Sequence, residues 1–416
     1  MTDKLQRLHT ADNAQKTNSS KETSGAKMTN IAVMAIPLAL YIHIPWCVKK
    51  CPYCDFNSHE RGELPEAAYL QALLTDLDQD LSLVGDRPVE TVFIGGGTPS
   101  LLSGDFYQQL FQGIRQRLCL SDQAEITLEA NPGTVEAGRF AGFREAGINR
   151  LSIGVQSFNN THLQALGRIH DASAAIDAAR QAREAGFTTF NLDIMHALPG
   201  QSRAQALEDL QQAMELQPTH LSWYELTIEP NTVFYRSPPD QPSPDNMADT
   251  EEAGFALLAS QGFHRYEVSA FSQDGHACRH NLNYWQFGDY LGIGAGAHGK
   301  ITNASRGTIH RYQKTRKPED YLANPEQARR QYQPVAKEDR LFEALMNGLR
   351  LVAGIRLQTV EDNTGLPAAQ WINNLGELRQ QGLLEVTAQR LQCTDKGMHH
   401  LNGVLEKLAE ALPQSA

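Results

Sequence analysis

The chain has 416 residues, a formal net charge of −11, 41% hydrophobic residues and 20% charged residues. This length exceeds one average domain, and the composition is ordinary for a soluble globular enzyme with a large core. The acidic balance argues against a nucleic-acid-binding surface and against a general affinity for anionic lipid, so an anionic ligand would have to meet arginines gathered locally.

The first segment, residues 1–36, is rich in Lys, Ser, Thr, Asn and Gln and lacks the charged-then-apolar pattern of a signal peptide. We expect it to be a disordered leader. No later run approaches the roughly 18 to 20 apolar residues that span a bilayer. The chain has six cysteines, and three of them crowd into one short stretch, unlike the spread of a disulfide framework. We therefore expect a cytoplasmic protein in a reducing compartment.

From residue 37 onward, short β-rich apolar runs alternate with longer stretches whose apolar residues recur at helical spacing. The predicted strands are residues 38–44, 91–95, 125–130, 150–156, 190–198 and 221–229. The helical spacing covers residues 70–81, 106–118, 172–182 and 207–216. Each strand needs a crossover helix to return in the same direction, so this order predicts a parallel sheet.

Polar residues of chemical interest follow these strands at the same end. In a parallel barrel, the strand ends form one mouth, where such folds keep their active sites. An open doubly wound sheet would instead carry G-x-G-x-x-G after its first strand, and here cysteines follow that strand. We therefore predict an α/β fold with a partial barrel of six βα units over residues 37–235, in preference to a Rossmann sheet.

Residues 236–335 form a predicted connecting region, which begins Pro-rich and contains "HNLNYW" from His280 to Trp285. Residues 336–416 read as two helices, a short β-pair and a terminal helix, which is typical of a winged-helix-like domain. Such a domain often binds DNA, but its second predicted helix carries no basic stripe. We therefore favour a packing role and expect no nucleic-acid partner.

Three cysteines, Cys47, Cys51 and Cys54, follow the first predicted strand at the spacing C-x3-C-x2-C. Clustered thiolates suit tetrahedral zinc or an iron-sulfur cluster. Zinc would need a fourth ligand such as His43 or His59, and the sequence has no second C-x-x-C pair to close the site. In a [4Fe-4S] cluster, three cysteines leave one iron open to an exogenous chelating group.

The cysteine spacing, with Tyr53 before the last thiol, resembles that of the radical S-adenosylmethionine (SAM) superfamily. The resemblance implies that the amino and carboxylate groups of SAM chelate the open iron. "GGGTP", residues 95–99, lets backbone groups approach the methionine end of SAM, although a tight turn before a helix is the alternative for one glycine. By resemblance, the positions that contact SAM are Tyr41, Tyr53, Gly97, Thr98, Glu129, Gln156, Arg168 and Asp193.

From Tyr41 to its C-terminus, the chain resembles the HemN-related family, which contains oxygen-independent coproporphyrinogen III oxidases and heme chaperones. Stretches that carry the resemblance include "FIGGGTPSLL", "RLSIGVQSF", "NLDIMHALPGQ" and "HNLNYWQFGDYLGIGAGAHG". Phe56 stands where the oxidase motif has a fourth cysteine, the segment before Tyr41 is mostly polar, and "HNLNYW" matches a sequence associated with heme binding in the chaperones. These features favour a chaperone that delivers heme to acceptor proteins. The alternative is the oxidase, which performs oxidative decarboxylation in porphyrin biosynthesis.

His280 is the candidate heme contact. A neutral imidazole is a good iron ligand, and Tyr284 and Trp285 are suited to pack against a porphyrin. A lone histidine beside aromatic residues is more often a hydrogen-bonded core residue, and Cys278 is a competing ligand. The expected cofactors are therefore a [4Fe-4S] cluster, SAM and heme. The expected partners are heme-accepting proteins and an electron donor of the flavodoxin or ferredoxin type; no catalytic residue is assigned.

Overall fold

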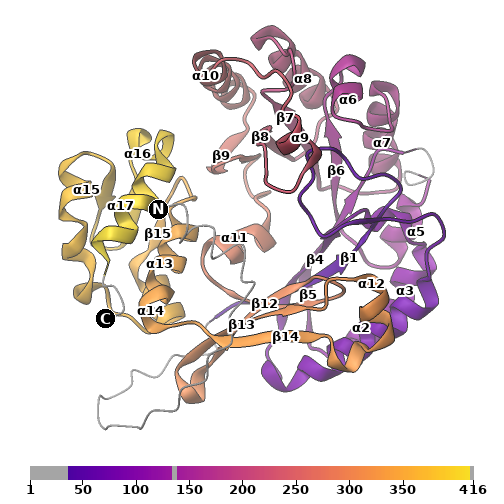
Figure 1. Cartoon of the computed structure of the whole chain (residues 1–416), viewed down its shortest axis with the longest axis horizontal. Coiled ribbons are helices and arrows are strands. Elements are labelled where there is room, and N and C mark those ends of the chain that lie inside the picture. Colours follow the sequence, from indigo (N-terminus) through magenta and orange to yellow (C-terminus); the bar gives the residue numbers. More distant parts are fainter. Residues whose placement is uncertain (1–35, 134–137, 413–416) are drawn as a thin grey trace.

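The structure, a computed structural model, describes residues 36–133 and 138–412 (Figure 1). Its centre is a twelve-stranded sheet with the strand order β14-β13-β12-β11-β1-β4-β5-β6-β7-β8-β10-β9. The expected leader lies outside the described residues except for Ile36. That side chain is buried, and its carbonyl accepts a hydrogen bond from Arg87, so Ile36 belongs to the folded core.

Six neighbouring strands of this sheet are parallel and confirm the predicted partial barrel. They are β1 (Leu38–Ile44), β4 (Val89–Gly96), β5 (Leu120–Ala130), β6 (Arg150–Gln156), β7 (Phe190–His196) and β8 (His220–Glu225). The outer face is covered by α2 (Glu66–Asp80), α3 (Gly104–Arg115), α5 (Phe140–Glu145), α6 (Asn160–Ala165), α7 (Ala172–Glu184) and α8 (Arg203–Glu215) (Figure 1). Apolar strand and helix residues merge there into one core.

Side-chain caps define where several of these helices begin. Ser103 accepts a hydrogen bond from the backbone of α3, Asp171 caps α7 in the same way, and Ser202 with Gln205 forms a capping box at α8. Such caps satisfy backbone N–H groups that the first helical turn leaves free. α3 and α8 therefore start before the first apolar residue that the spacing detects, whereas α7 starts at that residue.

Alternate residues along the parallel strands point into the barrel. Tyr41 of β1 stacks on Phe93 of β4, and Ser152 of β6 donates a hydrogen bond of 3.0 Å to Asp193 of β7. Because successive strand residues face opposite sides, the apolar set packs under the helices and this second set lines the interior. The barrel interior is therefore aromatic and polar.

The predicted connecting region supplies half of the sheet, which the sequence did not predict. β11 (Asp289–Ile293) pairs parallel with β1, and β12 (His298–Asn303), β13 (Thr308–Lys314) and β14 (Arg329–Pro334) continue antiparallel. At the other edge, β10 (Ala270–Ser272) and β9 (His264–Glu267) add to β8. α9 (Val233–Arg236) lies at the start of this region, and its other helices are α10 (Pro244–Ser260), α11 (Arg279–Trp285) and α12 (Pro318–Ala323).

Residues after Val335 form a mostly helical domain around a second apolar cluster. Its elements are α13 (Lys337–Gly348), β15 (Ile355–Arg356), α14 (Leu357–Thr364), α15 (Gly376–Gln380), β16 (Leu384–Val386), β17 (Arg390–Cys393), α16 (Asp395–His399) and α17 (Leu401–Ala411). The second helix that the sequence predicts, over residues 366–384, is wrong: residues 368–375 form short 3-10 turns, and α14 precedes them. Pro367, Asn373 and Asn374 favour turns over a continuous helix.

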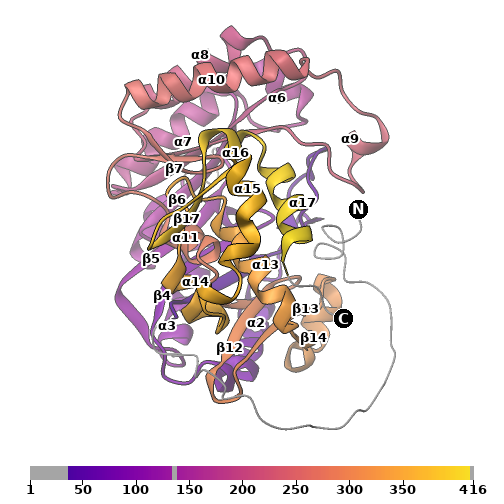
Figure 2. The same cartoon turned by 90° about the vertical axis from the view of Figure 1, so that its left-hand side faces the viewer.

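The C-terminal domain contacts strands near both edges of the open sheet. Glu343 of α13 pairs with Arg311 of β13, and the backbone N–H of Val352 donates to Tyr266 of β9 at 3.0 Å. Figures 1 and 2 show α13 beside α11, which lies between this domain and the barrel. The domain therefore covers the side on which the sheet does not close.

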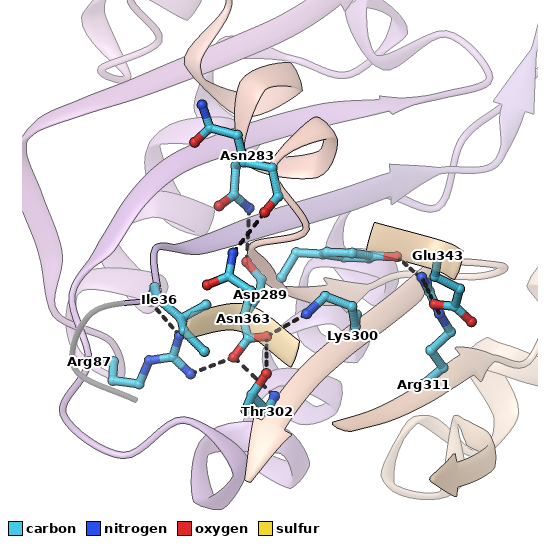
Figure 3. Close-up of polar contacts among 11 residues, drawn as sticks. Ile36, Arg87, Asn283, Asp289, Lys300, Thr302, Arg311, Glu343 and Asn363 are labelled. Atoms are coloured by element: carbon cyan, nitrogen blue, oxygen red, sulfur yellow. Dashed lines mark hydrogen bonds and ion pairs between the residues drawn. The ribbon is translucent and has the colours of Figure 1, made fainter. Parts of the chain in front are cut away.

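A buried ion-pair network anchors the added strands (Figure 3). Asp289, the first residue of β11, accepts hydrogen bonds of 2.8 Å from Arg87 and from Lys300, and two more from Thr302. The side chains of Arg87, Asp289 and Lys300 are at most 6% exposed. Two buried cations thus share one carboxylate at the start of β11.

None of the helices within residues 36–133 and 138–412 combines the length and the apolar character needed to cross a membrane.

Candidate functional site

The three cysteines lie on the loop that follows β1, at the mouth of the barrel. Two short strands, β2 (Trp46–Cys47) and β3 (His59–Glu60), pair at the base of this loop. Cys47, Cys51 and Cys54 are partly buried free thiols, and the backbone N–H of Cys54 donates to the carbonyl of Cys51 at 3.1 Å. One compact loop therefore presents all three sulfurs.

Polar groups from the loop itself and from other strand ends surround the sulfurs. Thr98 donates to Cys47 Sγ at 3.5 Å, Arg168 donates to Cys51 Sγ at 3.6 Å, and Ser58 Oγ lies 3.9 Å from Cys54 Sγ. Burial raises the pKa of Cys47 and Cys54, so iron binding there would have to displace protons. Hydrogen bonds to sulfur stabilise thiolates and tune iron-sulfur clusters, so this environment fits such a group.

The thiols are not arranged for a single ion. Within the described chain, no three His, Cys, Asp or Glu side chains converge closely enough to hold one metal ion. In an iron-sulfur cluster each cysteine binds a different iron atom, which does not require the sulfurs to meet at one point. The donor set of Cys47, Cys51 and Cys54 therefore suits a multi-iron cluster.

The glycine run after β4 packs against the cysteine loop. A side chain at Gly97 would place its Cβ 2.4 Å from the carbonyl oxygen of Trp46, and Gly96 has φ of +113°. The backbone N–H groups of Gly97 and Thr98 donate to Ile44 and Trp46 at 2.7 Å. Glycine is therefore required for this close approach, which brings Thr98 to Cys47.

Two predicted SAM contacts, Glu129 and Asp193, are partly buried carboxyl groups in the barrel. Gly96 N–H donates to Glu129 at 3.1 Å, while Asn191 and Ser152 donate to Asp193 at 2.9 and 3.0 Å. Burial, with Asp193 nearby, raises the pKa of Glu129 to about 7, and burial also raises the pKa of Asp193. Because the negative charge of one carboxylate disfavours ionisation of the other, a cationic ligand between them would stabilise both charges. The pair therefore favours a cationic ligand.

Gln156 and Arg168 connect further strand ends to the mouth. Tyr224 donates a hydrogen bond to Gln156 at 2.7 Å, and Gln156 has the uncommon φ of +71°. Arg168 donates to Asn131 at 2.7 Å, and Asn131 donates to Thr98 at 3.1 Å. Asn131 therefore joins the loops after three strands, a linking role that the motif did not indicate.

The two predicted tyrosines lie at different depths. Tyr53 packs against Phe234 of α9 at a ring distance of 6.2 Å, next to the cysteines. Tyr41 lies further inside, where its hydroxyl hydrogen-bonds His43 Nδ1 at 3.0 Å. The mouth thus gathers the cysteines with Tyr53, Gly97, Thr98, Glu129, Gln156 and Arg168, while Tyr41 and Asp193 line the wall below.

His280 lies at the opposite end of the interior. Its Nδ1 hydrogen-bonds Thr91 at 2.9 Å, and Thr91 precedes Gly96 by five residues on β4, or roughly 17 Å. The ring is 1% exposed and stacks on Phe93. Burial, and secondarily Arg150, lowers the pKa of His280 to about 3, so the imidazole is neutral.

Cys278, the competing candidate for heme contact, is also buried. Its thiol donates to Glu125 at 3.5 Å, and burial raises its pKa to about 12. A protonated thiol is a poor metal ligand. The environment therefore favours the neutral imidazole of His280 over Cys278.

Comparison with known proteins agrees with this geometry. The chain matches the Radical SAM superfamily over residues 41–213 and the HemN C-terminal domain over residues 335–400. The heme chaperone HemW of Escherichia coli K12 is 51% identical over 372 residues, covering 89% of this chain and 97% of that protein. HemW of Haemophilus influenzae is 49% identical with the same coverage. The solved structure of the E. coli coproporphyrinogen III oxidase HemN, a radical SAM enzyme, aligns at a TM-score of 0.75 and 25% identity, covering 92% of this chain and 91% of that one.

Proposed function

Because the chain belongs to the HemW family within the radical SAM superfamily, we propose that it is a heme chaperone that binds a [4Fe-4S] cluster, SAM and heme and delivers heme to acceptor proteins. The near-full-length identity to HemW of E. coli carries this proposal. A cytoplasmic location belongs to the proposal, because free thiols persist in a reducing compartment.

In this proposal, Cys47, Cys51 and Cys54 hold the cluster at the mouth. A reduced cluster would supply one-electron chemistry towards SAM, with an electron donor of the flavodoxin or ferredoxin type. Arg168 and Thr98 position the sulfurs through their hydrogen bonds, and the carboxyl groups of Glu129 and Asp193 face the cationic ligand. SAM contacts are assigned to Tyr41, Tyr53, Gly97, Thr98, Glu129, Gln156, Arg168 and Asp193.

The pH dependence of SAM binding tests Glu129. SAM carries an ammonium and a sulfonium group, so it should bind the ionised carboxylate more tightly. With a pKa of about 7 in the free protein, affinity should rise roughly tenfold between about pH 6 and a plateau above about pH 8. Anaerobic calorimetry measures this change, which Glu129→Gln should remove. An unchanged pH profile in that variant would exclude Glu129 as the titrating group.

Heme titration tests the role of His280. The Nε2 atom of His280 has no hydrogen-bond partner within the described chain. In the tautomer whose Nδ1–H donates to Thr91, its lone pair is available to iron once α11 shifts enough to admit a porphyrin. His280→Ala should weaken heme binding by about tenfold or more and change the Soret band, because the axial nitrogen is lost. Cys278→Ser is the matched control and should bind as the unmodified protein does. Unchanged heme binding by His280→Ala would remove this histidine from the proposal.

The similarity to the structure of HemN favours the oxidase as a second candidate. Phe56, 62% exposed, occupies the position of the fourth cysteine of the oxidase motif and argues against it. An anaerobic assay with coproporphyrinogen III, SAM and dithionite separates the two functions. Formation of protoporphyrinogen IX would establish the oxidase, while heme binding without decarboxylation supports the chaperone.

A further inference from the structure

Arg150 is a buried cation that lacks an ion-pair partner in the barrel interior. It is the first residue of β6, is 3% exposed and lies in register with Thr127 of β5. Two residues along the same strand face, Ser152 hydrogen-bonds Asp193, so Arg150 faces the same interior. Among the residues that the structure describes, Arg150 Nε has no hydrogen-bond partner and no carboxylate forms an ion pair with the guanidinium. Burying an unpaired charge costs several kcal/mol, so this arrangement requires a reason.

The nearest acidic groups already serve other partners. Glu125 accepts hydrogen bonds from the backbone of Arg279 at 3.1 Å and of His280 at 3.0 Å, which fixes the start of α11. Asp193 is held by Ser152 and Asn191. Burial lowers the pKa of Arg150, but Cys278 and Glu125 nearby outweigh that effect and raise it. The guanidinium therefore remains charged, and its Nε–H has no hydrogen-bond partner within the described residues.

Two other buried polar atoms close to this position also lack partners. Thr127 Oγ1 and His280 Nε2 have no hydrogen-bond partner within the described residues. The ring of His280 stacks on Phe93 at a centroid distance of 5.1 Å and makes an edge contact with Tyr284 at 4.8 Å. An unfilled guanidinium, a free imidazole nitrogen and aromatic faces together match a flat metal complex that bears carboxylates. Internal water is the simpler partner for these atoms. If water alone fills the space, the protein should bind heme and a heme ester, which lacks the propionate charges, equally well.

We propose that Arg150 binds a propionate carboxylate of the heme whose iron is coordinated by His280. This inference rests on the proposed function, and it assigns the barrel interior beside α11, rather than the cysteine mouth, as the place where the tetrapyrrole is held. The carboxylate supplies a direct ion pair, whereas Glu125 and Asp193 act on the guanidinium only from a distance.

The test compares heme with heme dimethyl ester, in which both propionates are neutral. The unmodified protein should bind heme about 10- to 100-fold more tightly than the ester, because one charge-assisted contact is lost. Arg150→Gln should lose that same factor for heme and nothing for the ester. Arg150→Lys should recover part of it, since an ammonium keeps the charge but not the paired geometry. Arg139→Gln is the matched control: Arg139 donates to the carbonyl of Ser100 in the loop after β4, so both affinities should be unchanged.

Each outcome separates the inference from the function on which it rests. Absence of heme binding by the unmodified protein would overturn the proposed function itself. Heme binding with equal affinity for heme and ester, or an equal loss of both in Arg150→Gln, would overturn the carboxylate contact alone. Iron content and SAM affinity report whether the variants fold. If Arg150→Gln cannot be purified as a folded protein, Arg150→Lys takes its place in the test. A ratio of heme to ester affinity in Arg150→Lys as large as that of the unmodified protein would contradict the proposal.

Discussion

A Cys51→Ala variant is expected to carry no [4Fe-4S] cluster after anaerobic reconstitution. The loop after β1 offers three thiols, and removing one leaves two iron atoms without a protein ligand when SAM is absent. Iron content should fall from about four atoms per chain to near zero. The electron paramagnetic resonance signal of the dithionite-reduced protein should disappear with it.

Cys119→Ala provides the control for this experiment. Cys119 is an exposed free cysteine outside the cysteine loop, so its removal should leave iron content and spectrum unchanged. Circular dichroism should show both variants folded, because the Cys51 thiol is only partly buried. A full cluster in Cys51→Ala would place the iron on other ligands and would contradict the assignment of the loop.

The largest effect on stability is expected from Asp289→Asn. This substitution keeps the shape of the side chain but leaves Arg87 and Lys300 buried without their carboxylate (Figure 3). Removing one partner of a buried ion pair costs about 3 to 5 kcal/mol, so the free energy of unfolding should fall by that amount. Denaturant unfolding measures the difference. The control is Asp177→Asn, which breaks an exposed pair with Arg180 and should change stability by less than about 1 kcal/mol.

The same variant should alter the dependence of stability on pH. Burial alone would raise the pKa of Asp289, but Lys300 and Arg87 outweigh it and lower the pKa below its ordinary value. A depressed pKa in the folded state contributes stability above the unfolded-state value of about 3.9, and this contribution is lost as the pH falls towards the folded-state pKa. Asp289→Asn should therefore flatten the acid side of the stability curve. A parallel curve for both proteins would show that Asp289 is not the relevant group.

Strand prediction from the sequence succeeded where burial imposes an apolar pattern. The predicted strands at residues 38–44 and 150–156 coincide with β1 and β6, because both are buried and β-rich. The edge strand β14 was missed because its six residues, "RRQYQP", carry no apolar pattern. It pairs through its backbone, and polar side chains with a terminal proline suit an exposed edge.

In the candidate functional site, too, only the features with a local sequence pattern could be predicted. The spacing of the cysteines and the position of polar residues after strands identified the mouth, because these signals are local in sequence. Arg150 was not singled out, since "RLSIGVQ" reads as an ordinary strand and the lack of a partner exists only in three dimensions. The linking role of Asn131 likewise depends on loops after three different strands meeting.

The parallel pairing of β1 with β11 also sets a condition on synthesis. Leu38 lies opposite Asp289 in that pair, a separation of 289 − 38 = 251 residues. At roughly 5 to 20 residues per second, the ribosome needs about 12 to 50 s to supply this partner. During that interval one edge of β1, in the centre of the finished sheet, has no neighbour and is open to other chains. The nascent chain therefore depends on keeping its first strand protected until its eleventh is made.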